Sequence, residues 1–140
     1  MNLERSFELT LKAEISEIPR VSAALENVMQ VHSFSKEEIL DTQLAVEEVV
    51  TNVIMHGYGG RAGEIRIMCH ATRGIIEIQI EDTAPLFNPL SVADPDFTTD
   101  IQDRRMGGLG IFLIRRVMDD VMYRNDQGKN ILILIKRKSG

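Results

Sequence analysis

Two runs of alternating apolar and polar residues place the strongest constraint on the fold of this chain. Residues 64–71 and 75–81 are rich in β-branched side chains and are separated by Thr72-Arg73-Gly74. Such a pattern is typical of a β-hairpin in which one face of each strand is buried. Both strands are therefore expected to contribute to a core, and the sheet they form needs a covering layer.

Two segments before the hairpin have the spacing of helices. After Pro19, apolar residues recur every three or four positions and predict a first helix. The sequence Ser35-Lys36-Glu37-Glu38 has the form of a capping box, which predicts the start of a long helix that ends at Gly57. The apolar stripe of this helix consists of Val46, Val49, Val50, Val53 and Ile54. We expect that stripe to pack on the sheet.

Shorter elements complete the prediction of a two-layer fold. Residues 7–13 alternate and predict a strand at the edge of the sheet. Residues 121–123 and 131–135 predict a final hairpin around the turn-forming residues 125–128. Residues 110–118 predict a third helix, with Ile111, Ile114, Arg115 and Met118 on one side. The whole chain, 1–140, is expected to be a single domain of the α/β (α+β) two-layer sandwich class.

Composition limits the compartment and the partners. A chain of 140 residues can bury one core without disulfides or structural metal. Its single cysteine, Cys69, is expected to be a buried thiol rather than a reactive one. The apolar runs are strand-sized and no secretory signal is visible, so a cytoplasmic location without a membrane span is expected. The net charge of −5 argues against nucleic acid as a partner.

Periodicity is lost between Pro85 and Met106, a segment that holds three prolines and four aspartates. Loops of this length inside a compact domain are usually functional or disordered. The sequence therefore predicts a lid at about residues 85–106, beside a binding site.

Glu48 and Asn52 lie four residues apart in the predicted second helix, away from its valine stripe. This spacing places both side chains on one face, where they can act on the same ligand. An amide oxygen is a hard ligand that suits Mg²⁺, and a carboxylate one turn away can accept a hydroxyl proton in phosphoryl transfer. Glu47 points to another side of the helix and is the less suitable base. The alternative is that Glu48 and Asn52 are solvated residues of a polar face.

Asp82 follows a predicted strand and precedes a turn, where a side chain can face a cleft. An ionised carboxylate only accepts hydrogen bonds, and the exocyclic amine of adenine only donates them. One buried aspartate can therefore select adenine over guanine, which presents an oxygen at that position. The alternative is an aspartate that initiates the turn by bonding its own backbone.

Glycines surround the predicted start of the third helix, in the sequence Gly107-Gly108-Leu109-Gly110. They allow close approach of the backbone to phosphates and leave N–H groups free at the helix start. Arg104-Arg105 adds positive charge where a terminal phosphate could lie. The alternatives are an ordinary glycine-rich turn and solvated arginines. His56, one turn after Asn52, is expected to be a hydrogen-bonded structural residue rather than a ligand.

Together these residues resemble a known family. The set Glu48-x-x-x-Asn52, Asp82-Thr83-Ala84-Pro85 and Gly107-Gly108-Leu109-Gly110-Ile111 resembles the ATP-binding boxes of the gyrase, histidine-kinase and MutL type of ATPase. Within that superfamily, residues 45–52 and 107–114 are most similar to the anti-sigma factor/serine-protein kinases, the RsbW and SpoIIAB group. The resemblance covers nearly the whole chain. It implies a histidine-kinase-like ATPase fold, with a mixed, mainly antiparallel sheet covered on one face by helices.

The resemblance also implies a role for each matching residue. ATP and Mg²⁺ would bind between the helices and the lid, with Asn52 as the Mg²⁺ ligand and Glu48 as the catalytic base. Asp82 would bind the adenine amine. The other nucleotide contacts would come from Ala84, Arg105, Gly107, Gly108, Leu109, Gly110 and Ile111.

Members of the family phosphorylate a serine or threonine of a small antagonist protein of the STAS type. They can sequester a sigma factor when the antagonist is unmodified or absent, and they tend to be homodimers. The resemblance therefore implies an ATP-dependent serine/threonine-protein kinase and anti-sigma factor of a partner-switching pathway. An alternative is a protein-sequestering module gated by ATP and ADP, without significant kinase activity. A detached sensor-kinase catalytic domain is a third interpretation, but no histidine lies in a sequence typical of a phospho-acceptor helix.

Two positions depart from the pattern of the superfamily. Ala84 stands where glycine is frequent, and its methyl group is expected to narrow the approach to the adenine. The stretch Gly128-Lys129-Asn130 aligns with a place where a threonine often supports the base. That supporting contact therefore lacks its usual residue.

Overall fold

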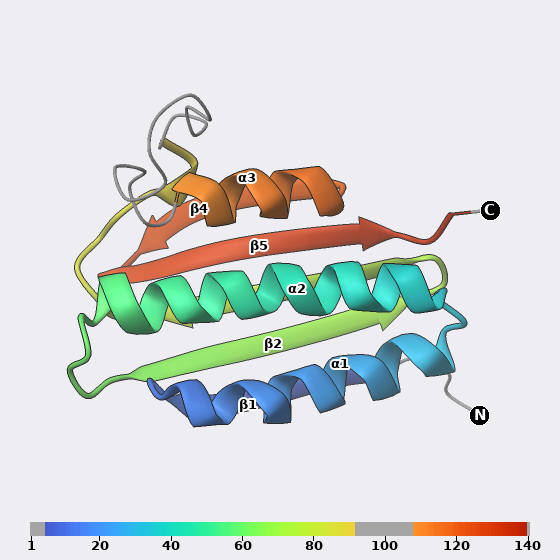
Figure 1. Cartoon of the computed structure of the whole chain (residues 1–140), viewed down its shortest axis with the longest axis horizontal. Helices are drawn as coiled ribbons and strands as arrows, with labels where there is room; N and C mark the ends of the chain where they lie inside the picture. The colour runs from blue at the N-terminus through green and yellow to red at the C-terminus, as the bar shows by residue number, and fades with distance from the viewer. Residues whose placement is uncertain (1–4, 92–107, 140) are drawn as a thin grey trace.

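A computed structural model describes residues 5–91 and 108–139 of the chain, and the statements below concern these residues. Three α-helices lie across one face of a five-stranded sheet (Figure 1). The elements are β1 (Arg5–Lys12), α1 (Ile18–Val31), α2 (Lys36–Asn52), β2 (Glu64–Thr72), β3 (Ile75–Asp82), α3 (Gly108–Val117), β4 (Asp120–Asp126) and β5 (Lys129–Arg137). Short helical turns occur at Ile15–Glu17, Val53–Gly57 and Pro89–Ser91. The predicted two-layer class is confirmed.

The sheet has the strand order β1-β2-β3-β5-β4. Each neighbouring pair of described strands is antiparallel, whereas the resemblance implied a mixed sheet that is mainly antiparallel. β1 lies at one edge, as predicted, and the β4–β5 hairpin inserts its second strand beside β3. This insertion places Asn130 of β5 directly opposite Asp82 at the end of β3.

The core lies between the sheet and the helices. The alternation of β2 and β3 buries every second side chain, including Ile67 and Ile78, against the valine stripe of α2. Cys69 is buried on the same side, as predicted. Burial raises the pKa of its thiol to about 12, so the thiol stays protonated at neutral pH.

The helix α2 begins with the predicted capping box. The hydroxyl of Ser35 accepts from the N–H of Glu38 at 3.0 Å, and the Glu38 carboxylate accepts from the N–H of Ser35 at 2.8 Å. The far end differs from the prediction of a regular helix to Gly57, because the α-helix ends at Asn52 and one π-helical turn, Val53–Gly57, follows. The N–H of Tyr58 closes this wider turn on the carbonyl of Val53 at 2.8 Å. Such turns are frequent at functional sites.

Ile111 and Ile114 of α3 and Met118 directly after the helix are buried in the core. Arg115 lies on the predicted side of the helix, but its side chain is exposed and donates to the carbonyl of Leu90 at 2.9 Å. A guanidinium keeps its charge in water while its stem covers apolar surface, which explains the outward position. Among the described residues, no helix is long and apolar enough to cross a membrane.

Candidate functional site

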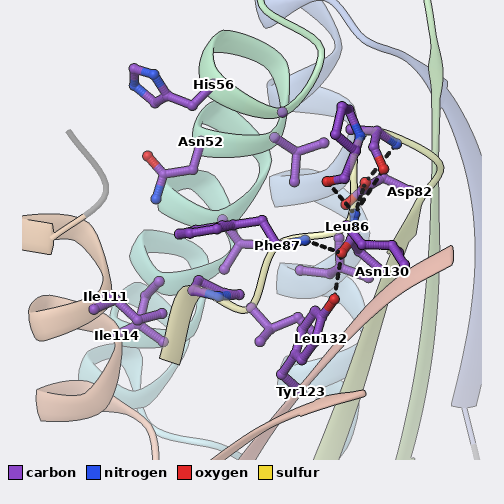
Figure 2. Close-up of a pocket in the computed structure, with 17 residues that line it drawn as sticks. Asn52, His56, Asp82, Leu86, Phe87, Ile111, Ile114, Tyr123, Asn130 and Leu132 are labelled. Atoms are coloured by element: carbon purple, nitrogen blue, oxygen red, sulfur yellow. Dashed lines mark hydrogen bonds between the residues drawn. The ribbon is translucent and has the colours of Figure 1, made fainter. Parts of the chain in front are cut away.

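A pocket of about 320 Å³ opens between α2, α3 and the adjoining ends of β3 and β5 (Figure 2). Its apolar walls come from both layers of the fold, because they include Val49 of α2, Ile80 of β3 and Leu132 of β5. Ile111 of α3 also lines the pocket, and its nucleotide contact stays a prediction. Asp82, Asn130 and Tyr123 lie on the opposite wall from Asn52 and His56 in this view. The pocket thus offers an apolar slot with polar groups on two sides, as small-molecule sites commonly do.

Asp82 lies at the buried end of the pocket, with 7% of its surface exposed. One carboxylate oxygen, Oδ1, accepts from the N–H of Ala84 at 3.0 Å and from the side-chain amide of Asn130 at 2.9 Å. The first of these bonds is the local turn that was the alternative interpretation of Asp82, so the same carboxylate shapes the turn and lines the pocket. Burial raises the pKa of Asp82, and the hydrogen bonds from Asn130 and Ala84 offset part of this effect.

Asn130, which stands where the pattern of the superfamily often has a threonine, makes several contacts at the pocket wall. Its side chain is buried and contacts Asp82, the backbone of the segment after β3, and the hydroxyl of Tyr123. Sequence reasoning noted Asn130 only as part of a departure from the superfamily's pattern, and it did not select Tyr123. The signal available was the register of the last hairpin, because a β5 paired with β3 brings position 130 opposite Asp82.

Ala84 is buried beside Gly57, the last residue of the π-helical turn. A methyl group added at Gly57 would come within 3.2 Å of the Ala84 methyl group. The glycine at position 57 therefore leaves room for the side chain at position 84. Both residues line the pocket, as the prediction for Ala84 requires.

Tyr58, which follows the π-helical turn, holds the end of β3 in place. Its hydroxyl donates to the carbonyl of Glu64 at 2.6 Å and accepts from the N–H of Thr83 at 3.0 Å. Its ring packs so closely on Gly63 that a methyl group there would come within 2.3 Å of a ring carbon. Tyr58 thus fixes the position of the residue next to Asp82.

Glu48 and Asn52 lie on the half-exposed side of α2, as their spacing predicted. Gly110, in the first turn of α3, packs directly against both side chains. A methyl group at Gly110 would lie 3.0 Å from the amide nitrogen of Asn52 and 3.1 Å from Oε2 of Glu48. Two of the three sequence motifs therefore meet here, and the missing side chain of Gly110 is what permits the approach.

His56 lies one turn after Asn52 and lines the same wall of the pocket (Figure 2). Its side chain is exposed, and among the described residues its ring makes no hydrogen bond. The prediction of a hydrogen-bonded structural histidine therefore has no support in this part of the chain. The position is that of a residue accessible to a ligand.

The remaining predicted contacts belong to the segment before and at the start of α3. Gly108 and Leu109 form the first turn of this helix. Arg104-Arg105 and Gly107 lie outside the described residues, as do residues 92–106 of the predicted lid. Their proposed contacts with phosphates stay predictions.

Comparison with protein families identifies this fold and motif set. The sequence profile of the "Histidine kinase-like ATPase domain" matches residues 11–136. A "Serine-protein kinase RsbW" of Listeria innocua serovar 6a is 30% identical over 133 residues, covering 91% of this chain and 83% of the relative. The "Serine-protein kinase RsbW" of Bacillus thuringiensis strain Al Hakam is 25% identical over 130 residues, covering 90% of this chain and 81% of the relative.

Comparison with solved structures gives the same fold. The crystal structure of the RsbU and RsbW domains of a Mycobacterium tuberculosis protein matches 96% of this chain and 32% of that chain, with a TM-score of 0.64. The identity is 17%, so this likeness bears on the fold alone.

Proposed function

Because the chain belongs to the histidine kinase-like ATPase family and is similar to RsbW serine-protein kinases, we propose that it binds ATP in this pocket and transfers the terminal phosphate to a serine or threonine of a partner protein. The observation that carries the proposal is the packing of Gly110 against Glu48 and Asn52. This packing brings the start of α3 together with Glu48, the candidate base, and Asn52, the candidate metal ligand. Asn52 lines one side of the pocket, and the buried carboxylate of Asp82 lies on the other side.

The buried side of the pocket suits adenine. Ile80, Leu132 and Ile111 supply apolar surface for a planar ring, and Asp82 supplies an acceptor for its amine. The carboxylate is held by two hydrogen bonds before any ligand arrives. Preorganisation of this kind lowers the cost of ordering the site on binding.

The residues near Asn52 suit Mg²⁺ that arrives with a nucleotide. Among the described residues, no group of three histidine, cysteine, aspartate or glutamate side chains could hold a metal ion. A site with few protein ligands fits Mg²⁺, which commonly takes one or two protein oxygens and completes its shell with waters and phosphates. The amide of Asn52 would be that protein ligand. When bound, the ion would supply positive charge that offsets the charge of the phosphates.

Glu48 would act on the acceptor hydroxyl. Its carboxylate lies one helical turn before Asn52 and makes no hydrogen bond with the described residues, so it is available to accept a proton. A positioned base of this kind typically contributes a factor of about 10² to 10⁴ to the rate. The N–H groups in the first turn of α3 would bind the phosphates, because a helix N-terminus favours anions.

The acceptor protein follows from the relatives, which bear the name of serine-protein kinases. We propose a small anti-sigma factor antagonist of the STAS type as the substrate. In the absence of the unmodified antagonist, the domain would sequester a sigma factor, and it would act as a cytoplasmic homodimer. The net charge of −5 agrees with a protein partner rather than with nucleic acid.

The test is transfer of labelled phosphate from Mg-ATP to a STAS-type antagonist encoded in the same genome, with the modified residue located by mass spectrometry. Phosphoserine or phosphothreonine on the antagonist is the expected result. If nucleotide binds and partner binding differs between ATP and ADP, but no phosphoprotein accumulates, the domain is a nucleotide-gated sequestering module. The absence of nucleotide binding would contradict both functions.

A further inference from the structure

The side of α2 that faces away from the sheet carries two large apolar side chains close to the candidate base. Leu40 and Leu44 are 56% and 38% exposed, and Glu48 follows Leu44 by about one helical turn. We propose that Leu40 and Leu44, together with Arg116 of α3, form the surface on which the phosphate-accepting protein docks. This inference rests on the proposed function, because it names the contact through which the acceptor protein reaches Glu48.

The helices α2 and α3 hold this surface in place. They lie side by side and antiparallel on the same face of the sheet, so their outer faces are adjacent (Figure 1). At one end, Gly110 of α3 packs against the last turns of α2. At the other end, the ammonium group of Lys136 donates to the carbonyl of Val117 at 2.6 Å and lies 3.7 Å from the carboxylate of Asp41. These contacts fix the position of α3 along α2 before any partner binds.

The two leucines lie where an amphipathic helix normally has polar residues. The apolar stripe of α2 faces the sheet, and the opposite side holds Glu37 and Thr51 besides Leu40 and Leu44. Neither leucine belongs to the core of the described residues. A single exposed leucine is common, but two on successive turns form contiguous apolar surface, and such surface with a polar rim marks interaction sites.

The reaction determines which protein covers this surface. Proton transfer requires the acceptor hydroxyl to come within about 3 Å of the Glu48 carboxylate. A stable interface removes about 800 Å² from each partner, which corresponds to a patch with a radius of about 16 Å. Because α2 rises about 1.5 Å per residue, Leu44 lies about 6 Å and Leu40 about 12 Å along the helix from Glu48. Both leucines fall inside a footprint of this size around Glu48, so their continuity with the reacting group identifies the acceptor protein as the occupant.

Arg116 adds a positive charge to the same surface. It follows Gly110, which packs against Glu48, and in the antiparallel arrangement it lies beside the turn of α2 that holds Leu44. Its side chain is exposed, its guanidinium carbon lies 5.7 Å from the centre of the Phe112 ring, and it makes no ion pair with the described residues. The partner that fits has apolar side chains beside its serine or threonine and a carboxylate opposite Arg116.

The experiment measures single-turnover transfer from saturating Mg-ATP to the STAS-type antagonist over a range of antagonist concentrations. The double variant Leu40→Gln/Leu44→Gln removes the apolar contacts and keeps the helix, because leucine and glutamine have similar helix propensities. The antagonist concentration at half-maximal rate should rise at least about tenfold, since the loss of interface anchors commonly weakens binding by such a factor. The maximal rate and the calorimetric affinity for Mg-ATP should stay at their wild-type values.

The matched control is Val31→Gln. Val31 is 48% exposed, and as the last residue of α1 it lies near the start of α2, at the opposite end from Glu48 (Figure 1). Its substitution should leave the half-maximal concentration, the maximal rate and the affinity for Mg-ATP unchanged. Arg116→Gln should raise the half-maximal concentration by less than the double variant does and should weaken its dependence on salt, because an exposed ion pair with the antagonist is lost.

The outcomes separate this inference from the proposed function. A wild-type half-maximal concentration in the double variant would show that the antagonist docks elsewhere. A lower maximal rate at an unchanged half-maximal concentration would show that the leucines act through the catalytic residues, and a shift from dimer to monomer with antagonist binding retained would assign the surface to a second copy of the chain. Each of these results overturns the inference and leaves the proposed function standing. If the wild type transfers no phosphate, the proposed function fails, and the inference fails with it.

Discussion

Two glutamates on one helix, Glu38 near the start of α2 and Glu48 near its end, have opposite surroundings. Glu38 is buried and its carboxylate accepts hydrogen bonds from Ser35 and from both the N–H and the hydroxyl of Ser139. Glu48 is half-exposed beside Gly110 and has no hydrogen bond to the described residues. A carboxylate whose oxygens are all engaged holds the fold together, whereas one without partners is available for a substrate.

The pKa of Glu38 follows from this difference. Burial alone would raise it, but the hydrogen bonds from Ser35 and Ser139 outweigh burial and lower the pKa from 4.5 to about 2. Glu38 is therefore a charged structural residue that joins the C-terminal segment to the capping box. The comparison shows how hydrogen-bond partners separate two similar residues on one helix. The glutamate whose carboxylate is fully hydrogen-bonded serves stability, and the one without such bonds is the candidate for catalysis.

The largest expected effect comes from removing the free carboxylate. Glu48→Gln should lower phosphoryl transfer by about 10² to 10⁴, because an amide cannot accept the hydroxyl proton, while ATP binding is kept. The measurement is single-turnover transfer to the antagonist together with calorimetric ATP affinity. Glu47→Gln is the matched control: it is the adjacent residue, its carboxylate accepts from Ser22 at 3.0 Å, and its loss should leave transfer near the wild-type rate. Unchanged transfer in Glu48→Gln would show that Glu48 is not the base.

A second variant tests whether the space beside Glu48 matters. Gly110→Ala would place a methyl group about 3 Å from the side chains of Glu48 and Asn52, which must then shift. A misplacement of reacting groups by about 1 Å can cost about a hundredfold, and the shift required here is smaller, so transfer should fall by about tenfold. Alanine favours a helix over glycine, so the free energy of unfolding should be unchanged or higher by up to about 1 kcal/mol. A wild-type rate would contradict the proposed meeting of the two motifs at this place.

Substitution of the buried glutamate, Glu38, should lower stability and leave transfer unchanged. Glu38→Gln should lower the free energy of unfolding by about 1 to 3 kcal/mol at neutral pH, because the amide cannot accept from Ser35 and Ser139 as a carboxylate does. Denaturant unfolding measures this change, and transfer activity of the folded variant should stay near the wild-type value. Loss of transfer without loss of stability would break the distinction between the two glutamates.

The same residue gives a pH dependence with a defined sign. The pKa of Glu38 is lower in the folded state than in the unfolded chain, so its contribution is complete above pH 4.5 and is lost as the pH falls toward about 2. The wild type should therefore lose more stability over that interval than Glu38→Gln. Parallel curves for the two proteins would contradict the assignment.

Local patterns were sufficient to predict most of the fold. The hairpin of β2 and β3, the capping box of α2 and the edge position of β1 depend on short-range periodicity and caps, and all three are present. The π-helical turn after Asn52 and the exposed position of Arg115 were not predicted. The first depends on how residues 53–60 close against the strands, and the second on the packing angle of α3, neither of which the helical period contains.

The candidate site was predicted unevenly for the same reason. Glu48, Asn52 and Asp82 have chemistry that is visible in sequence, and the pocket includes the latter two. The contacts that Asn130 and Tyr123 make became visible only through the register of β5 with β3 and β4. The room for Ala84 likewise depends on Gly57, a residue in a distant segment. Contacts between strands that are far apart in the chain are what a single sequence does not display.

The most direct test of the pocket's assignment is a calorimetric comparison of Mg-ATP with Mg-GTP for the wild type and for Asp82→Asn, with the exposed Asp126→Asn as control. Wild type and control should bind ATP at least about tenfold more tightly than GTP, because the Asp82 carboxylate accepts from an amine and opposes a carbonyl. Asp82→Asn should lose this preference, since its amide can present a donor. Equal affinity for the two nucleotides in the wild type, or an unchanged preference in Asp82→Asn, would contradict adenine recognition by Asp82.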